Sequence, residues 1–167
     1  EAANLLSHSS DKILPAIAIG LFAGLRRSEI GRLEWSQVNF KHEHIEVKAS
    51  SFKSPARRLV PMRNNLRQSL DPYRQRNGPV MPTAMIYRSR LSSARKAAGI
   101  EKWPHNALRH SFASYNLAAF ENAPALSGEM GHVSIKMIFQ HYRALVLQKD
   151  AESFWSITPL AKGKSKA

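Results

Sequence analysis

The sequence predicts a mainly α-helical fold with a small antiparallel β-sheet or hairpin. Apolar residues recur at helical spacing through most of the chain, and they alternate with period two only between about Val38 and Met62. The chain has 167 residues and no Pro-, Gly- or Ser-rich stretch that divides it. We therefore expect a single domain with its own core over residues 1–160, followed by a basic and disordered tail at 161–167.

The first helices are predicted on either side of a glycine. Asp11 can cap a helix whose apolar residues run to Gly24, where the helix ends. Ser28 is then expected to cap the next helix. Arg26 falls at the junction, where a side chain can project from a rigid scaffold into a cleft.

The sheet and the later helices follow from the same patterns. Ile45 and Val47 share one face of a strand, Pro61 ends a second strand, and Lys53 lies near the turn between them. Further helices are predicted at residues 65–73, 83–98, 107–120, 124–130 and 134–142, and a last apolar segment at residues 151–157.

The composition indicates a polyanionic partner. Lys and Arg number 25 against 12 acidic residues, which gives a formal net charge of +13. The cations are spread along the chain rather than along one helix face, which favours nucleic acid over a membrane surface. The absence of cysteine excludes a disulfide framework and Cys-based zinc sites, and we expect a cytoplasmic protein.

One tyrosine stands downstream of basic residues in four separate segments. Tyr142 follows Arg26, Lys53, Arg109 and His132 along the chain. A tyrosine hydroxyl with a pKa near about 10 is a poor nucleophile at neutral pH, and neighbouring cations would favour its ionised form. The same cations would bind a phosphodiester, so this set of groups suits the transfer of a DNA strand to a tyrosine.

Each of these residues also has an ordinary interpretation. A single arginine is usually a solvated surface residue, and composition alone leaves open whether Arg26 or Arg27 points inward. Lys53 could provide affinity for the phosphate backbone or act as a general acid that protonates the leaving oxygen. His132 could contact the phosphate or be structural, and Tyr142 alone would be an ordinary aromatic residue.

The segments that carry these residues resemble the tyrosine recombinase, or phage integrase, family in its catalytic domain. AGLRRSEIGRLEW is similar to the family pattern T/A-G-L-R-x-S/G-E-L, which assigns the first catalytic arginine to Arg26 and a supporting acid to Glu29. The hairpin lysine of the family lies eight residues before the proline of a V-P-L/I/M ending, which assigns it to Lys53. LRHSFAS resembles the second arginine box and assigns its arginine to Arg109.

The last box and one departure complete the resemblance. MGHVSIKMIFQHY resembles L-G-H-x-S…Y, which assigns the second histidine to His132 and the nucleophile to Tyr142, at a spacing of ten residues where nine is commoner. The family's first histidine stands three residues before the second arginine, where this chain has Asn106. His105 lies one position earlier and is kept as a possible substitute. Asparagine can hydrogen-bond a phosphate but cannot shuttle protons near neutral pH.

The resemblance implies DNA strand cleavage and rejoining without metal, nucleotide or other cofactor. Tyr142 would form a 3′-phosphotyrosyl bond and Lys53 would protonate the 5′ oxygen. The transition state would be stabilised by Arg26, Arg109 and His132. Further contacts to DNA are expected from Arg27, Arg57, Arg58 and His110.

The resemblance also implies double-stranded DNA as partner and a homotetramer on two duplexes. It further implies an upstream DNA-binding domain outside this sequence, which starts at Glu1 and is interpreted as a fragment. Integration or excision of a phage or mobile element is the expected function. A catalytically silent DNA-binding relative and a type IB topoisomerase are the alternatives. The apolar stretch at residues 151–155 could pass to a neighbouring subunit or pack on its own domain.

Overall fold

The structure is a computed structural model that describes residues 1–49, 57–131, 138 and 146–158. Lys53, His132 and Tyr142 lie outside the described residues, as do the hairpin turn, the tail at 161–167 and all but Ile138 of the helix predicted at 134–142. Within the described part, the prediction of a mainly helical fold with a small antiparallel sheet is confirmed.

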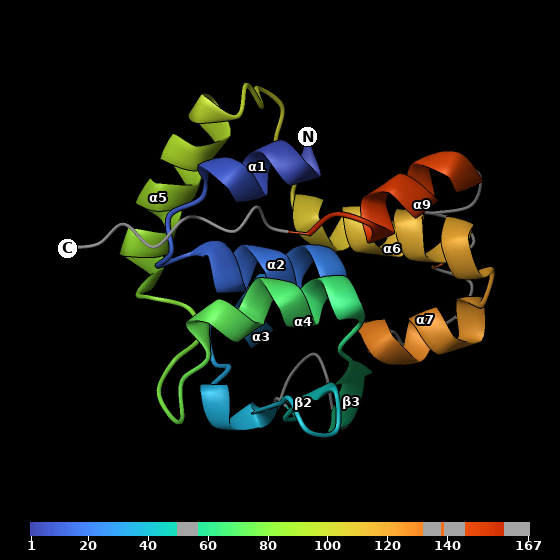
Figure 1. The fold of residues 1–167 in the computed structure, drawn as a ribbon, viewed down its shortest axis with the longest axis horizontal. Helices are drawn as coiled ribbons and strands as arrows, with labels where there is room; N and C mark the ends of the chain where they lie inside the picture. Colours follow the sequence, from blue (N-terminus) through green and yellow to red (C-terminus); the bar gives the residue numbers. More distant parts are fainter. Residues whose placement is uncertain (50–56, 132–137, 139–145, 159–167) are drawn as a thin grey trace.

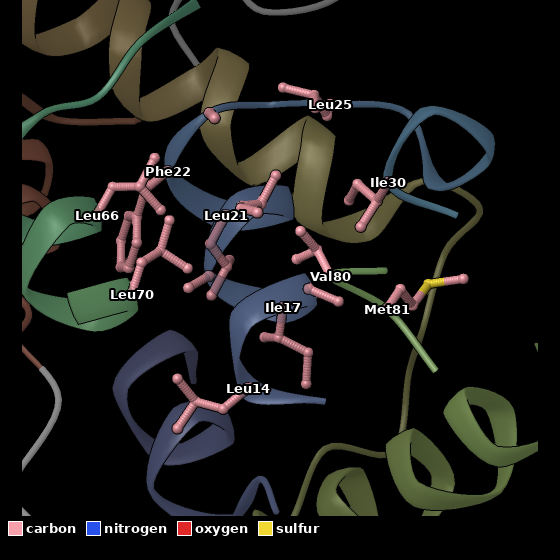
Figure 2. Close-up of a cluster of buried hydrophobic side chains, with 14 of the residues drawn as sticks. Leu14, Ile17, Leu21, Phe22, Leu25, Ile30, Leu66, Leu70, Val80 and Met81 are labelled. Atoms are coloured by element: carbon pink, nitrogen blue, oxygen red, sulfur yellow. The ribbon is translucent and has the colours of Figure 1, made fainter. Parts of the chain in front are cut away.

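Helix α2 (Leu14–Phe22) forms the centre of the core, and all of its residues are buried. Helices α1 (Ala2–His8) and α4 (Asn64–Leu70) lie on either side of α2 in Figure 1, and α6 (Ala107–Phe120) packs against it as well. Figure 2 shows apolar side chains of α2 and α4 in this core, together with Leu25, Ile30, Val80 and Met81. A helix that is apolar on every face is stable only when it is buried all round, so the other helices surround α2.

A three-stranded antiparallel sheet covers one end of the helices. Its strands are β1 (Val38–Asn39), β2 (His44–Val47) and β3 (Arg58–Pro61), in the order β1-β2-β3. Ile45 and Val47 are 0% and 4% exposed, so the period-two alternation correctly identified the buried face. Helix α7 (Ala123–Met130) lies beside β3 (Figure 1).

Two of the predicted helix caps are wrong. Helix α3 spans Arg27–Ile30 and is capped at Arg26, whose backbone N–H donates to the Glu29 carboxylate at 2.7 Å. A glutamate at the third helical position can reach back in this way, so no cap from Ser28 is needed. Helix α2 begins without a side-chain cap, and Asp11 instead accepts a hydrogen bond from the Tyr73 hydroxyl at 3.1 Å.

Helices α5 (Ala84–Ala97), α6, α7 and α9 (Gln148–Trp155) agree with predicted segments to within three residues at each end, whereas α1 and η1 (Trp35–Gln37) had no predicted counterpart. Residues 107–120 match α6, and the segment predicted at 65–73 divides into α4 and the 3₁₀ helix η2 (Asp71–Tyr73). None of the described helices has both the length and the apolar composition that a bilayer crossing requires.

Helix α9 packs on its own chain, against α6. The Phe154 ring stacks on Tyr115 with centroids 4.1 Å apart and lies 5.3 Å from the Phe22 ring of α2. The Trp155 indole N–H donates to the Tyr115 carbonyl at 3.1 Å. Of the two interpretations of residues 151–155, this structure therefore has the one in which they pack on their own domain.

Candidate functional site

A buried carboxylate organises the charged site. Glu29 is 6% exposed, and its carboxylate accepts hydrogen bonds from two arginine side chains. Both terminal nitrogens of Arg58 donate to it at 2.9 Å, one to each oxygen. The guanidinium of Arg26 donates at 3.2 Å, in addition to the backbone N–H of the same residue. Glu29 thus fixes the Arg26 side chain relative to the start of α3.

The pKa of Glu29 lies below its ordinary value. Burial by itself would raise this pKa, because the charged form loses its hydration. The hydrogen bonds from Arg58 and from the Arg26 backbone, together with the charges of both arginines, outweigh burial. Glu29 is therefore ionised at neutral pH and serves as a permanent anion that holds two cations.

Two arginines donate to the carbonyls at the C-terminal end of α7. Arg26 donates to the Gly131 carbonyl at 3.2 Å, and Arg109 donates to the Met130 carbonyl at 2.8 Å. The last carbonyls of a helix have no partner within the helix and carry the negative end of its dipole, so they favour cations. These two carbonyls directly precede His132 in the sequence. The segment leading to His132 is thereby attached to both arginines.

Arg58 also contacts this end of α7. Its Nε donates to the Glu129 carbonyl at 2.9 Å. Gly131 ends the helix with φ +62°, and a Cβ at this position would lie 3.1 Å from the Arg58 guanidinium. Glycine is thus favoured here both by the left-handed backbone and by the close approach of Arg58.

A second glycine brings Arg109 to the same place. Gly24, with φ +63°, accepts a hydrogen bond from the Arg109 side chain. A Cβ on Gly24 would lie 2.2 Å from the Phe112 ring, a distance at which atoms overlap. Only glycine therefore allows the loop before Arg26 to approach α6, which carries both Phe112 and Arg109.

The cluster is positively charged as a whole. The guanidinium groups of Arg26 and Arg58 bind the single carboxylate of Glu29, and Arg109 joins them through the Met130 carbonyl, which Arg26 also approaches. Arg109 is 6% exposed and the Arg58 side chain 10%, whereas the Arg26 side chain is 25% exposed. Arg26 is consequently the member of the cluster that is most accessible to an anion from solvent.

Arg26 lines a surface groove of about 820 Å³, and His105 and Asn106 line the same groove. A neighbouring cavity of about 450 Å³ is lined by Arg109 and by the same two residues. The exposed pair before α6 therefore adjoins both catalytic arginine candidates. Asn106 caps α6 with φ +57°, a conformation that asparagine tolerates better than most residues.

The other cations that we expected to contact DNA lie in different surroundings. Arg27 is exposed, with its guanidinium 5.7 Å from the centre of the Tyr87 ring, and it also lines the groove. Arg57 is exposed and pairs with Glu46 at 2.8 Å. His110 is exposed on α6. Arg58 instead directs its guanidinium to Glu29 and α7, as described above.

Comparison with known proteins assigns the chain to a family. The model of the phage integrase family matches residues 2–149. The chain belongs to the phage integrase family. The tyrosine recombinase XerC of Pseudomonas syringae pv. syringae is 29% identical over 180 residues, covering 98% of this chain and 57% of the relative. The chain thus spans just over half of the length of this relative.

Solved structures of integrases and recombinases share the fold. The XerA recombinase matches with a TM-score of 0.71 at 21% identity, over 91% of this chain and 60% of that one. The catalytic domain of bacteriophage HP1 integrase matches with a TM-score of 0.67 at 27% identity, over 84% and 82%. The Tn1549 transposon integrase, solved with transposon right end DNA, matches with a TM-score of 0.60 at 22% identity, over 85% and 58%. The predicted tyrosine recombinase catalytic-domain fold is confirmed.

The three tyrosines described in this phage integrase family chain all ionise less readily than an exposed tyrosine. Burial raises the pKa of Tyr87 to about 12, although the nearby Arg27 charge opposes the shift. Burial and the adjacent Asp11 raise the pKa of Tyr73 to about 12. Burial also raises the pKa of Tyr115, with smaller contributions from acidic neighbours. All three described tyrosines are therefore weaker nucleophiles than an exposed tyrosine.

Sequence reasoning missed the position of Arg58. The signal was present, because Arg58 shares the inward face of β3 with the fully buried Val60. A charged residue on that face requires a buried partner, which Glu29 provides at 2.9 Å. In the described part of the chain, no group of three or more His, Asp and Glu side chains is arranged to hold a metal ion.

Proposed function

We propose that this chain is the catalytic domain of a site-specific tyrosine recombinase that cleaves and rejoins DNA through Tyr142. One observation carries the proposal. Arg26 and Arg109, which are 83 positions apart, donate to the Gly131 and Met130 carbonyls respectively, the two carbonyls that directly precede His132. Residues from three of the family's boxes are thus connected through one positively charged cluster. A protein that only bound DNA would need the charge but not this convergence.

The chemistry follows from the groups that the boxes supply. The Tyr142 hydroxyl releases its proton to solvent as its oxygen attacks the scissile phosphorus, the bond to the 5′ oxygen breaks, and Lys53 protonates that oxygen. A 3′-phosphotyrosyl bond results, and attack by another DNA 5′ hydroxyl reverses the step. Arg26, Arg109 and His132 donate to the non-bridging oxygens as charge develops on them.

Glu29 holds Arg26 for this role and does not itself contact the substrate. Its carboxylate bonds both the backbone and the guanidinium of Arg26, so the arginine needs little reorganisation when a phosphate arrives. Asn106 or His105, which line the same groove as Arg26, supplies a further contact to the phosphate. In this scheme the reaction proceeds without metal or cofactor.

The proposed partner is double-stranded DNA, bound by a homotetramer that holds two duplexes. The net charge of +13 and the DNA-bound structure of the similar Tn1549 integrase support the choice of DNA. Arg27, Arg57 and His110 would contact phosphates outside the reacting centre. Similarity to the HP1 integrase supports integration or excision of a phage or mobile element in the cytoplasm of a bacterium.

The nucleophile can be tested with a nicked suicide substrate, which traps the covalent intermediate. The full-length protein should form a protein–DNA adduct that persists on a denaturing gel. Tyr142→Phe should abolish the adduct, and Tyr87→Phe should not, because burial keeps the Tyr87 hydroxyl protonated. An adduct that survives Tyr142→Phe would assign the nucleophile to another residue.

Two adjacent arginines offer a matched test of transition-state stabilisation. Arg26→Lys should reduce the rate of adduct formation at saturating DNA by about 100-fold or more, because lysine cannot reproduce the planar fork of donors. Arg27→Lys should change it by less than about threefold, since its role is affinity. Equal losses of rate in both variants would show that Arg26, like Arg27, contributes only its positive charge to DNA binding.

The roles of His105 and Asn106 are tested by single substitutions. Asn106→His should maintain or raise the cleavage rate if position 106 contacts the phosphate, and His105→Ala should then have little effect. The reverse pattern would assign the contact to His105.

A topoisomerase-like activity is tested by relaxation of a supercoiled plasmid without an attachment site, which a site-specific recombinase should leave supercoiled.

A further inference from the structure

Arg63 connects the start of α4 to the end of α7. It is the residue that precedes α4, and its guanidinium forms a paired interaction with the Glu129 carboxylate at 3.0 and 3.1 Å. The two side chains are 23% and 13% exposed. Paired hydrogen bonds between arginine and a carboxylate fix both position and orientation, so this contact is more restrictive than a single ion pair.

Three aromatic rings surround the same guanidinium. The centre of the Arg63 guanidinium lies 5.0 Å from the Phe120 ring, 5.1 Å from the Trp155 ring and 5.8 Å from the Phe112 ring. Two of these rings belong to α6 and one to α9. Aromatic faces attract a cation and favour a flat guanidinium, which limits the rotamers that Arg63 can adopt.

Glu129 transmits this constraint to the charged cluster. Its side chain is held by Arg63, and its backbone carbonyl accepts the Nε–H of Arg58 at 2.9 Å. The next two carbonyls along the chain are those that Arg26 and Arg109 bind. A shift of this turn would therefore displace the hydrogen-bond partners of all three arginines in the cluster.

We propose that Arg63 is a positioning residue for DNA cleavage, which holds the C-terminal end of α7 so that the arginines around Glu29 keep their reactive arrangement. Arg63 acts through Glu129 and makes no contact with the substrate. The inference rests on the proposed function, because it concerns the geometry of the same site. It also makes the docking of α9, through Trp155, a condition for that geometry.

The experiment compares Arg63→Gln, Glu129→Gln and the double variant in the full-length protein. Adduct formation on the nicked substrate is measured at saturating DNA, together with DNA affinity and thermal stability. Each single variant should reduce the cleavage rate by about 10- to 100-fold, as expected for small displacements of catalytic groups. The double variant should lose no more than the single variants, because both remove the same interaction.

Arg67→Gln is the matched control. Arg67 lies in α4, which Arg63 precedes, and pairs with Glu43 at 2.7 Å, but both side chains are about half exposed and Glu43 lies just before β2 rather than in α7. This variant should cleave at the rate of the unaltered protein. Arg63→Lys should recover only part of the rate, since it restores the charge but not the paired geometry.

DNA binding separates a positioning role from a direct DNA contact. In Arg63→Gln the dependence of DNA affinity on salt should be unchanged, whereas loss of a phosphate contact would lower the slope by about one. Full-rate cleavage by Arg63→Gln, additive losses in the double variant, or a lowered salt slope would each overturn the inference. If the unaltered protein itself forms no adduct, it is the proposed function that fails.

Discussion

Two ion pairs of this protein have similar distances between their charged atoms but different surroundings. Arg67 and Glu43 approach to 2.7 Å at the surface, where their side chains are 49% and 54% exposed. Arg58 and Glu29 approach to 2.9 Å in the interior, where their side chains are 10% and 4% exposed. The shorter pair is the weaker one, because water screens its attraction and hydrates each partner when the pair opens.

The comparison shows that the consequence of losing a partner, rather than the distance, decides what an ion pair does. If Glu43 is removed, Arg67 returns to solvent. If Glu29 is removed, the guanidinium of Arg58 remains buried beside Arg26 without the compensating charge. The interior pair therefore constrains the site, whereas the surface pair contributes little to it.

The largest expected effect comes from removing the buried acid. Glu29→Ala should lower the free energy of unfolding by about 3–5 kcal/mol, because it leaves buried cations uncompensated. Glu43→Ala should lower it by no more than about 1 kcal/mol. Urea unfolding of both variants measures the difference. Equal losses would show that burial does not distinguish the two pairs.

A smaller effect is expected from the glycine that lies against Arg58. Gly131→Ala and Gly99→Ala both place alanine at a positive φ, +62° and +69°, which costs about 1–2 kcal/mol. Only position 131 brings the new methyl group to 3.1 Å from Arg58, while position 99 has no atom within 4 Å. Gly131→Ala should therefore be the more destabilising variant in thermal unfolding, and equal shifts would indicate that Arg58 adjusts without cost.

The interior pair should also respond to acid. The pKa of Glu29 is lower in the folded protein than in the unfolded chain, so its ionised form stabilises the fold at neutral pH. This contribution is complete above the ordinary glutamate pKa of about 4.3 and is lost as the pH falls through the lower folded value. The difference in unfolding free energy between the natural protein and Glu29→Gln should be constant from pH 8 to 5 and shrink below it. A difference that stays constant at low pH would contradict the assignment.

The smallest effect concerns salt at the surface pair. Raising the salt concentration to about 1 M should remove most of the stability difference between the natural protein and Arg67→Gln, because exposed charges are screened. The difference between the natural protein and Glu29→Gln should persist under the same conditions. Chemical unfolding in urea at two salt concentrations provides the measurement.

Sequence patterns predicted the elements well because most of them carry a regular apolar period. The buried face of β2, the extent of α6 and the helix end at Gly24 follow from local spacing. The sequence also brought Arg26 and Glu29 together through one box. The structural role of Arg58 could not be predicted from the sequence. Its partner Glu29 lies in another segment, and such a contact produces no periodic pattern in the sequence around Arg58.

The same limit explains the incorrect helix caps and the missed Arg63. Ser28 has the right chemistry for a cap, but Glu29 already occupies the backbone N–H group at the start of α3. Arg63 stands before α4 as an ordinary polar residue, and its meaning depends on Glu129, 66 positions away. Local composition carries no information on such contacts.

The hydrogen bond from Arg26 to Gly131 joins residues 105 positions apart, and this separation determines when the site can form. During synthesis, the segment around Arg26 leaves the ribosome long before α7 exists, so an unfinished chain holds the arginine without its carbonyl partners. Closing so large a loop is also slow compared with forming a single helix. The complete charged cluster is thus absent from every form of the chain in which α7 has not yet formed, and the proposed cleavage of DNA with it.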